Sequence, residues 1–222
     1  MILDILTLTL DPVAPFGGTV QETNRYFSGR FSEYAKEHGN DRSNFLTRYP
    51  AVIVREIKGC IQVTGINEGA GFLDAYVRQD RESFPGQEIL RISWDSPKIS
   101  TKMEFGPVEE MLDYEFVTPW AGLTQENYRK FYTLKGKTER DAFVAKILAD
   151  SLHTLAHALG MDEPGPVTCT TNLHFQKPRI NGKSTIVFTG KFQMNFRIPD
   201  FLALGKSVGR GYGAIIFTGS SP

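Results

Sequence analysis

An alternating run near the C-terminal end of this 222-residue sequence constrains its fold more than any other feature. From Ile186 to Ile198, large apolar residues alternate with polar or charged residues that include Lys191 and Arg197. A period of two is the pattern of a strand with one buried side and one solvent-facing side. Asn181-Gly182 lies just before the run and favours a tight hairpin turn. The run therefore predicts a long strand in an antiparallel sheet.

The rest of the second half predicts a complete set of elements around this strand. We expect strands at 112–118, 167–176 and 212–218, and helices at 124–134, 138–160 and 199–204. Thr138, followed three residues later by Asp141, indicates a capping box at the start of the longest helix, and Gly160 ends it. Pro199 suits the first turn of the last, short helix. The order is β-α-β-β-α-β, the ferredoxin-like unit.

The first half predicts the same order of elements. Strands are expected at 5–11, 51–57, 60–66 and 88–94, and helices at 19–37 and 68–78, with Asn67 as the cap of the second helix. We therefore predict an α+β chain of two tandem ferredoxin-like, RRM-like domains. The N-terminal domain spans 1–98, and the C-terminal domain spans 108–222 and contains a glycine-rich loop.

Composition and charge narrow the setting of the protein. The two cysteines, Cys60 and Cys169, belong to no CxxC pair, which favours a reducing, cytoplasmic environment. We find no targeting signal and no apolar run long enough for a membrane span, and thus expect no membrane partner. The net charge is zero, but the chain from Gly165 onward carries seven Lys or Arg against one acid. Such a basic end creates a local field for an anionic partner.

The glycine-rich stretch from Asp200 to Phe217 lies within this basic end. Lys206, Ser207 and Arg210 stand among four glycines, Gly205, Gly209, Gly211 and Gly213. Dense glycines let backbone N–H groups approach a phosphate closely. A P-loop is disfavoured, because the predicted order is helix, glycines, strand, and Asp200 stands where that motif needs a glycine. A plain turn into an edge strand is the alternative to a binding loop.

Four-stranded sheets with one open face often bind single-stranded RNA, so two such domains with a basic glycine loop favour RNA over a small metabolite. The sequence indicates no catalytic Cys-His or Ser-His-Asp arrangement and no paired carboxylates for two metals. We therefore expect no metal and no cofactor. The RNA 2′-OH would attack its own phosphate while a histidine takes the proton.

His38 is the candidate base, because it lies in a polar loop at the end of the first predicted helix. Tyr34, Arg48 and Tyr49 are candidate helpers, although Arg48 and Tyr49 would equally lead into a core strand. The spacing of His153 and His157 could hold a metal, but the sequence offers no third ligand.

Two passages of the sequence carry a resemblance to a known family. The C-terminal IPDFLALGKSVGRGYGAI is similar to the glycine-rich loop of the CRISPR repeat-processing endoribonucleases of the RAMP superfamily. RYPAVIV and VTGINEGAGFL resemble the first hairpin and second helix of one of its subgroups. The resemblance implies a cytoplasmic prokaryotic protein that cuts CRISPR precursor RNA within its repeats without a metal, leaving a cyclic phosphate. The family's catalytic histidine maps by position onto His38.

Two functions remain after this comparison of motifs. The first is an endoribonuclease that makes guide RNAs, with Lys191, Arg197 and the glycine-rich loop from Gly205 to Gly213 binding the RNA. The second is a non-catalytic RAMP subunit that holds guide RNA together with other CRISPR effector subunits. The sequence leaves open whether the protein forms a homodimer. A nucleotide-binding enzyme that uses Gly205 to Ser207 is a remote third alternative.

Overall fold

The computed structural model describes residues 1–12, 20–37, 49–57, 59–79, 90–92, 99–180 and 183–220. The chain forms two compact units. The N-terminal unit comprises Ile2–Met103 together with Gly209–Gly211, and the C-terminal unit comprises Met1, Glu104–Val208 and Tyr212–Pro222. Among the described helices, none is long and apolar enough to cross a membrane.

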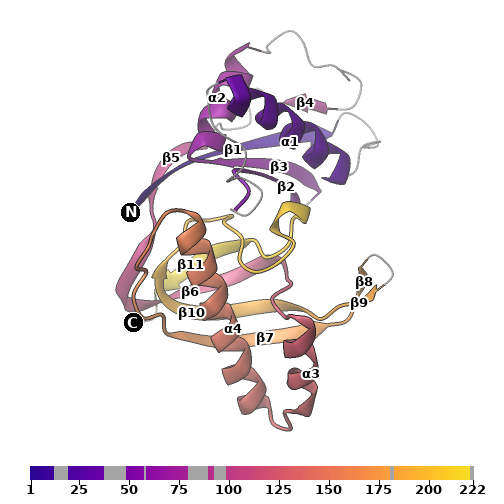
Figure 1. The fold of residues 1–222 in the computed structure, drawn as a ribbon, viewed down its shortest axis with the longest axis vertical. Helices are drawn as coiled ribbons and strands as arrows, with labels where there is room; N and C mark the ends of the chain where they lie inside the picture. The colour runs from indigo at the N-terminus through magenta and orange to yellow at the C-terminus, as the bar shows by residue number, and fades with distance from the viewer. Residues whose placement is uncertain are drawn as a thin grey trace. The chain divides into compact units, whose positions relative to one another are not determined.

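The N-terminal unit is built on an antiparallel sheet with the strand order β2-β3-β1-β4 (Figure 1). Its strands are β1 (Ile2–Pro12), β2 (Val52–Ile57), β3 (Cys60–Ile66) and β4 (Leu90–Ile92). β1 and β3 lie in the middle, and Val63 of β3 is in register with Leu8 of β1 and Val54 of β2. These apolar side chains are all buried, as their alternation with polar residues predicts. A further strand, β5 (Ile99–Glu104), pairs with β1.

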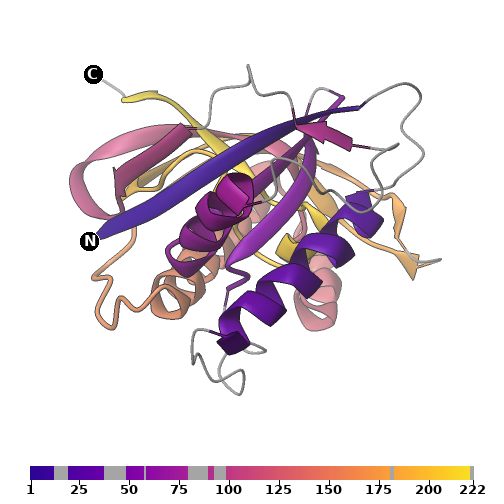
Figure 2. The same cartoon turned by 90° about the horizontal axis from the view of Figure 1, so that it is seen from above.

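Two helices, α1 (Val20–Glu37) and α2 (Glu68–Gln79), pack side by side on this sheet (Figure 2). Aromatic rings join them: Phe72 of α2 lies 5.5 Å from Phe31 and 5.4 Å from Tyr34 of α1, measured between ring centroids. The Tyr26 and Tyr76 hydroxyls are 2.8 Å apart. The rings meet edge-on or tilted, which is the favourable geometry for aromatic pairs.

The C-terminal unit has its own four-stranded antiparallel sheet, with the order β11-β6-β10-β7 (Figure 1). Its strands are β6 (Gly106–Trp120), β7 (Cys169–Gln176), β10 (Val187–Arg197) and β11 (Ile215–Ser220). A small hairpin of β8 (Arg179–Ile180) and β9 (Lys183–Ser184) extends from it. The apolar residues of the alternating run are buried as predicted, including Phe188, Phe192 and Met194.

Two α-helices belong to this unit, α3 (Gln125–Thr133) and α4 (Lys137–Ala158). The side chain of Thr124 caps α3 by accepting a hydrogen bond from the Asn127 N–H. α4 packs against β7 and begins after Gly136, so the capping box expected at Thr138 is wrong. Asp141 instead forms an ion pair of 2.9 Å with Lys137.

The helix predicted at 199–204 is also wrong. Phe201 takes a left-handed φ of 64°, and the backbone of the segment bonds mainly to Gly213 and Ile215. The Phe201 N–H donates to the Ile215 carbonyl at 2.7 Å, and the Leu204 N–H donates to the Gly213 carbonyl at 2.9 Å. A single 3-10 turn, η2 (Val208–Arg210), is the helical element of this stretch.

Two smaller expectations from the sequence also need comment. Asn67 has a φ of 51° before α2, and its side chain accepts a hydrogen bond from the Asp4 N–H at 3.1 Å instead of capping the helix. The Asn181-Gly182 turn lies outside the described residues. The predicted fold class, α+β with two tandem ferredoxin-like domains, is confirmed.

Candidate functional site

The glycine-rich stretch forms a loop on a paired base. Ala203 and Ala214 form an antiparallel bridge, and Lys206 forms another with Ala121 at the end of β6. The Asp200 carboxylate accepts a hydrogen bond from the Phe217 N–H at 2.7 Å. These bonds satisfy the backbone at the base and thereby fix the loop from 205 to 212.

Two glycines of the loop are required by packing inside the protein. Gly205 has a φ of +85° and lies against the indole of Trp120, and Gly213 has a φ of +76° and lies against the carbonyl of Leu204. A side chain at either position would overlap those atoms. Trp120 is completely buried, and its indole N–H has no hydrogen-bond partner among the described residues. These two glycines therefore shape the loop through their packing inside the protein.

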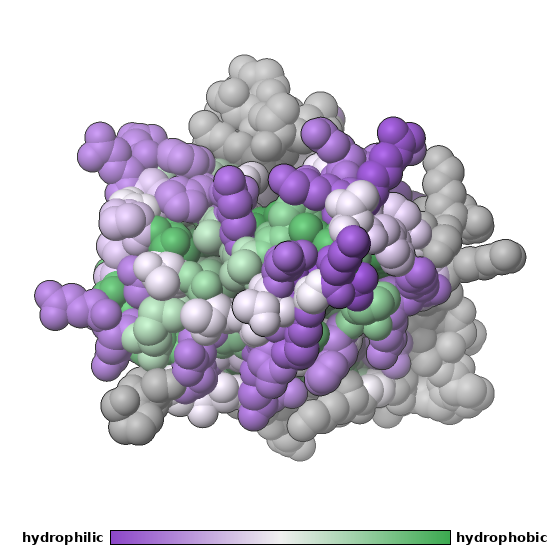
Figure 3. All heavy atoms as spheres, turned by 90° about the horizontal axis from the view of Figure 1, so that it is seen from below, coloured by the Kyte–Doolittle hydropathy of each residue, from purple (hydrophilic) through white to green (hydrophobic). Residues whose placement is uncertain are grey.

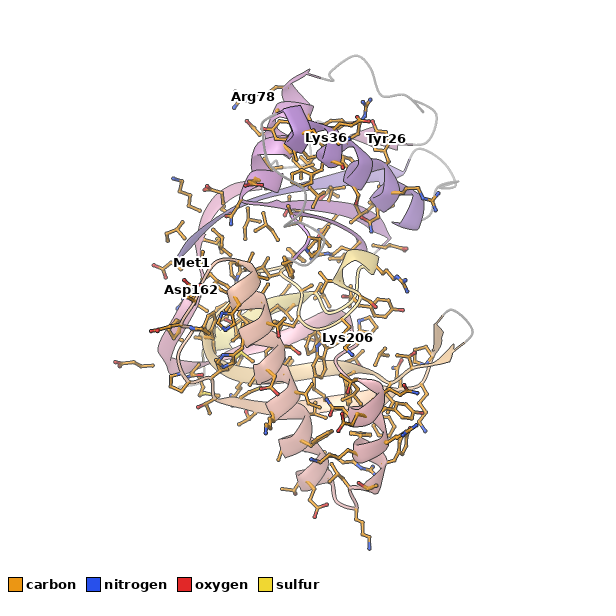
Figure 4. All side chains as sticks on the ribbon, viewed as in Figure 1. Met1, Tyr26, Lys36, Arg78, Asp162 and Lys206 are labelled. Atoms are coloured by element: carbon orange, nitrogen blue, oxygen red, sulfur yellow. The ribbon has the colours of Figure 1, made fainter. Side chains whose placement is uncertain are left out.

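The polar residues of the loop are exposed. Lys206 (labelled in Figure 4) and Ser207 are exposed, and Ser207 takes a left-handed φ of 60°. Arg210 at the end of η2 is also exposed, and neither cation is ion-paired with a described acid. A side chain added at Gly209 would meet nothing within 4 Å. This outer side therefore offers positive charge and an open stretch of backbone.

Three residues of the loop, Gly209–Gly211, belong to the N-terminal unit. The Asn24 side-chain amide of α1 donates a hydrogen bond to the Gly209 carbonyl. Gly211 has a φ of +85°, and a side chain there would lie 3.4 Å from Cβ of Arg55. Arg55 is 1% exposed, and its burial lowers the pKa of the guanidinium to about 10, so it is charged at neutral pH. The N-terminal unit therefore holds this segment beside a buried positive charge.

The two strand cations predicted to bind RNA lie beside acids. Lys191 is exposed on β10 and stands in register with Glu115 of β6. Arg197 lies 3.7 Å from both Glu104 and Glu110. Neighbouring acids offset much of the positive field at these positions. The open face of the C-terminal sheet is thus of mixed charge, unlike the outer side of the loop.

The predicted catalytic residues are only partly described. His38 and Arg48 lie outside the described residues. Tyr34 is half-buried near the end of α1, with its ring tilted against Phe72. Tyr49 is half-buried and interacts electrostatically with Arg55. The structure therefore gives Tyr34 a packing role and places Tyr49 near a buried cation.

The three described histidines are on the C-terminal unit. His153 is half-buried and His157 exposed on α4, whereas His174 is exposed on β7. Within the described ranges, no group of three or more His, Cys, Asp or Glu residues is arranged to hold a metal ion.

The two units and the loop define a class of protein before any relative is considered. Both units are ferredoxin-like, and in the C-terminal unit the glycine-rich loop precedes the last strand. The family model of the Cas6b C-terminal domain matches residues 106–218, which is just over half of the 222-residue chain. The chain therefore belongs to the family of the Cas6b C-terminal domain.

Solved structures share the fold, and a curated relative matches part of the chain. The chain is similar to a CRISPR RNA processing endoribonuclease Cas6b, with a TM-score of 0.71 and 21% identity over 98% of this chain and 100% of that one. A second Cas6b structure gives a TM-score of 0.67 at 19% identity, with the same coverage. An uncharacterized protein of Methanocaldococcus jannaschii, MJ0978, is 29% identical over 131 residues, 58% of this chain and 87% of the relative.

Proposed function

We propose that this protein binds CRISPR precursor RNA and cleaves it within its repeats to release guide RNAs. The match of residues 106–218 to the Cas6b C-terminal domain carries the proposal, because it spans the C-terminal sheet and the whole glycine-rich loop. The exposed Lys206, Ser207 and Arg210 support it, since cations and backbone N–H groups are the usual partners of RNA phosphates. Inward-packed glycines hold this surface in shape before RNA arrives, which lowers the entropy cost of binding.

The chemistry that we propose needs no metal. A base removes the proton of the 2′-OH, the resulting oxygen attacks the adjacent phosphorus, and the 5′-oxygen of the next nucleotide leaves with a proton. The products are a 2′,3′-cyclic phosphate and a 5′-OH end. His38 is our candidate base, next to the C-terminal end of α1, and Tyr34, Arg48 and Tyr49 are candidates for orienting the RNA or stabilising charge.

Cleavage of labelled repeat RNA in EDTA tests the enzyme activity. We expect the wild-type protein to cut, and His38→Ala to lose roughly 10²- to 10⁴-fold in cleavage rate while it still binds, which is the usual contribution of a general base. His157→Ala, at an exposed histidine of α4, is the matched control and should cut normally. A 2′-deoxy substitution at the cleavage site should block cutting but not binding.

The outcomes separate the two candidate functions. A wild-type protein that binds repeat RNA tightly but does not cut it would support the non-catalytic RAMP subunit, which holds guide RNA with other effector subunits. Equal cutting by wild type and His38→Ala would retain the enzyme but remove His38 as its base. Dependence on added Mg²⁺ would contradict the metal-free mechanism.

Substitution of the two exposed cations of the loop tests whether the loop binds RNA. Lys206→Ala and Arg210→Ala should each weaken RNA binding and reduce the slope of affinity against salt concentration by about one unit, because each removes one phosphate contact. Lys146→Ala, an exposed lysine of α4, is the control. If the loop variants retain the wild-type salt slope, the loop does not bind phosphate.

A further inference from the structure

A pocket in the C-terminal unit lies between α3, α4 and the edge strand β7, away from the loop in the sequence. Its volume is about 320 Å³, at the lower end of the roughly 300–1,000 Å³ usual for small-ligand sites. Phe131, Leu173 and Phe188 form a buried apolar floor, each no more than 8% exposed. This is room enough for one planar ring of nucleobase size.

The rim of the pocket combines an exposed ring with cations. Phe175 is 41% exposed and meets Phe131 edge-on at 5.3 Å between ring centroids. Arg140 lies over the Phe131 ring at 5.3 Å, and its Nε donates to the Leu134 carbonyl at 3.0 Å, which holds the guanidinium in place. Lys137, which forms an ion pair of 2.9 Å with Asp141, and the exposed His174 also lie on the rim.

The surroundings extend this chemistry beyond the pocket. Tyr132 is 39% exposed beside Phe131, and Lys177 lies 4.3 Å above its ring. The hydrogen bond to Tyr132 raises the pKa of Lys177, so the lysine stays charged. On the face seen from below, hydrophobic surface and hydrophilic side chains are interspersed (Figure 3).

Exposed rings interleaved with cations favour single-stranded nucleic acid over a protein segment. Bases stack on aromatic faces while Lys and Arg meet the phosphates, and this combination does not depend on sequence. The carboxylate of Asp141, also on the rim, can accept a hydrogen bond from a base amino group. A hydrophobic protein segment would use the floor but would leave Arg140 and Lys137 facing apolar groups, at a cost in desolvation.

We propose that this pocket is a second RNA site that receives one unpaired nucleotide, whose base stacks on Phe175 and whose phosphates meet Arg140 and Lys137. The inference rests on the proposed function, because the RNA is the precursor that the protein processes. It adds a site that holds unpaired RNA, separate from the glycine-rich loop. Lys177 and Tyr132 extend the surface to the neighbouring nucleotide.

Fluorescence anisotropy with two labelled probes tests the site: the CRISPR repeat RNA and a single-stranded uridine decamer. Phe175→Ala should weaken binding of both probes by about 5- to 150-fold, the range expected when one base loses its stacking partner. Ile2→Ala on β1 is the control for an exposed apolar side chain, because Ile2 is 56% exposed but lines no part of the pocket. It should bind both probes as wild type does.

Two conservative variants separate stacking from simple apolar contact. Phe175→Tyr keeps the ring and should bind as wild type, whereas Phe175→Leu keeps an apolar side chain and should bind as weakly as Phe175→Ala. These variants also keep the test valid if Phe175→Ala is destabilised, since both retain bulk against Phe131. Ultraviolet crosslinking of 5-iodouridine RNA should give an adduct on β7 in wild type and lose it in Phe175→Leu.

The failures of the two proposals are distinguishable. If wild type binds the decamer through Phe175 but neither binds nor cuts repeat RNA, the pocket remains and the proposed function falls. If wild type binds and cuts repeat RNA and Phe175→Ala changes neither probe's affinity, the pocket is not an RNA site. An oligomeric mass that depends on Phe175, with unchanged RNA affinity, would overturn the inference in favour of contact with a second copy of the chain.

Discussion

The two units cover their sheets in different ways. In the N-terminal unit, both α1 and α2 pack on the sheet and are joined through aromatic rings centred on Phe72. In the C-terminal unit, α4 packs against β7, but the helix expected between β10 and β11 is absent. The stretch after Pro199 takes its place and buries Leu202, Leu204 and Val208.

This difference shows what the glycine-rich loop provides that a helix would not. A helix keeps its shape through its own backbone hydrogen bonds, so its outer residues can change freely. The loop keeps its shape through close approaches at Gly205 and Gly213 to Trp120 and Leu204. These contacts with the core fix the conformation of the outer surface of the loop. The backbone at that surface stays exposed and can contact a ligand.

The largest effect that we predict tests the helical half of the comparison. Phe72→Ala removes a 4%-exposed ring that meets three other rings, and should destabilise the N-terminal unit by about 3–5 kcal/mol, as for large-to-small core substitutions. Hydrogen exchange measured by mass spectrometry reports the units separately. Faster exchange should be confined to α1, α2 and their sheet. Equal loss of protection in the C-terminal sheet would show that the units unfold together.

The second prediction tests the loop half. Gly213→Ala places a side chain at a φ of +76° against the Leu204 carbonyl, and should cost roughly 2–4 kcal/mol from strain and overlap. Chemical denaturation followed by circular dichroism measures the loss. Gly165→Ala, at a φ of +73° with nothing within 4 Å, is the matched control, because it keeps the strain and removes the overlap. A Gly213→Ala protein as stable as wild type would mean that the loop base is not fixed by this contact.

The third prediction concerns Tyr114, a buried hydroxyl of the C-terminal sheet. It donates to the Phe196 carbonyl at 2.9 Å and accepts from the Ile198 N–H at 3.0 Å, so Tyr114→Phe should cost about 1–2 kcal/mol at neutral pH. Burial raises the pKa of Tyr114 from its ordinary value of 10.0 to about 12.

That pKa also predicts an alkaline effect with a definite sign. Between about pH 10 and 12 the unfolded chain loses the phenol proton and the folded protein keeps it, so stability should fall as the pH rises through this window. Denaturation at pH 8 to 11 measures the slope. Tyr114→Phe should flatten the slope relative to wild type, and an unchanged slope would assign the alkaline effect to other groups.

The smallest expected change in stability is at Gly209. Gly209→Ala meets nothing within 4 Å and should alter stability by no more than about 0.5 kcal/mol. It should nevertheless weaken binding of repeat RNA, because the added methyl stands where the proposed phosphate approaches the backbone. Binding and thermal unfolding of the same preparation give both quantities. Unchanged RNA affinity would move the contact away from this residue.

The sequence alone predicted the elements whose apolar and polar residues alternate regularly. It did not predict segments whose conformation depends on contacts with residues distant in the sequence. The buried residues of β10 followed from their alternation alone. The apolar residues after Pro199 are as compatible with a short helix as with the non-helical conformation that the structure shows. The backbone hydrogen bonds to Gly213 and Ile215 determine that the stretch is not helical.

The same reason limits what could be predicted of the site. Which glycines face inward depends on Trp120, which is remote in the sequence from Gly205. The pocket could not be foreseen, because Phe131, Phe175 and Phe188 come from three separate elements. An exposed aromatic on an otherwise polar edge strand, Phe175 between His174 and Gln176, was the one local signal.

The assignment of residues to the two units has a consequence for how the protein can be divided. Met1 belongs to the C-terminal unit, where its amine donates to the Phe105 carbonyl at 2.7 Å, and Gly209–Gly211 belong to the N-terminal unit. Each unit therefore includes a short segment from the other half of the chain, and dividing the chain at one position does not give two complete units. A fragment ending at Met103 would lack the segment that bonds to Asn24 and lies against Arg55. A chimera that exchanges one unit between relatives should therefore also exchange Met1 or Gly209–Gly211, whichever belongs to that unit.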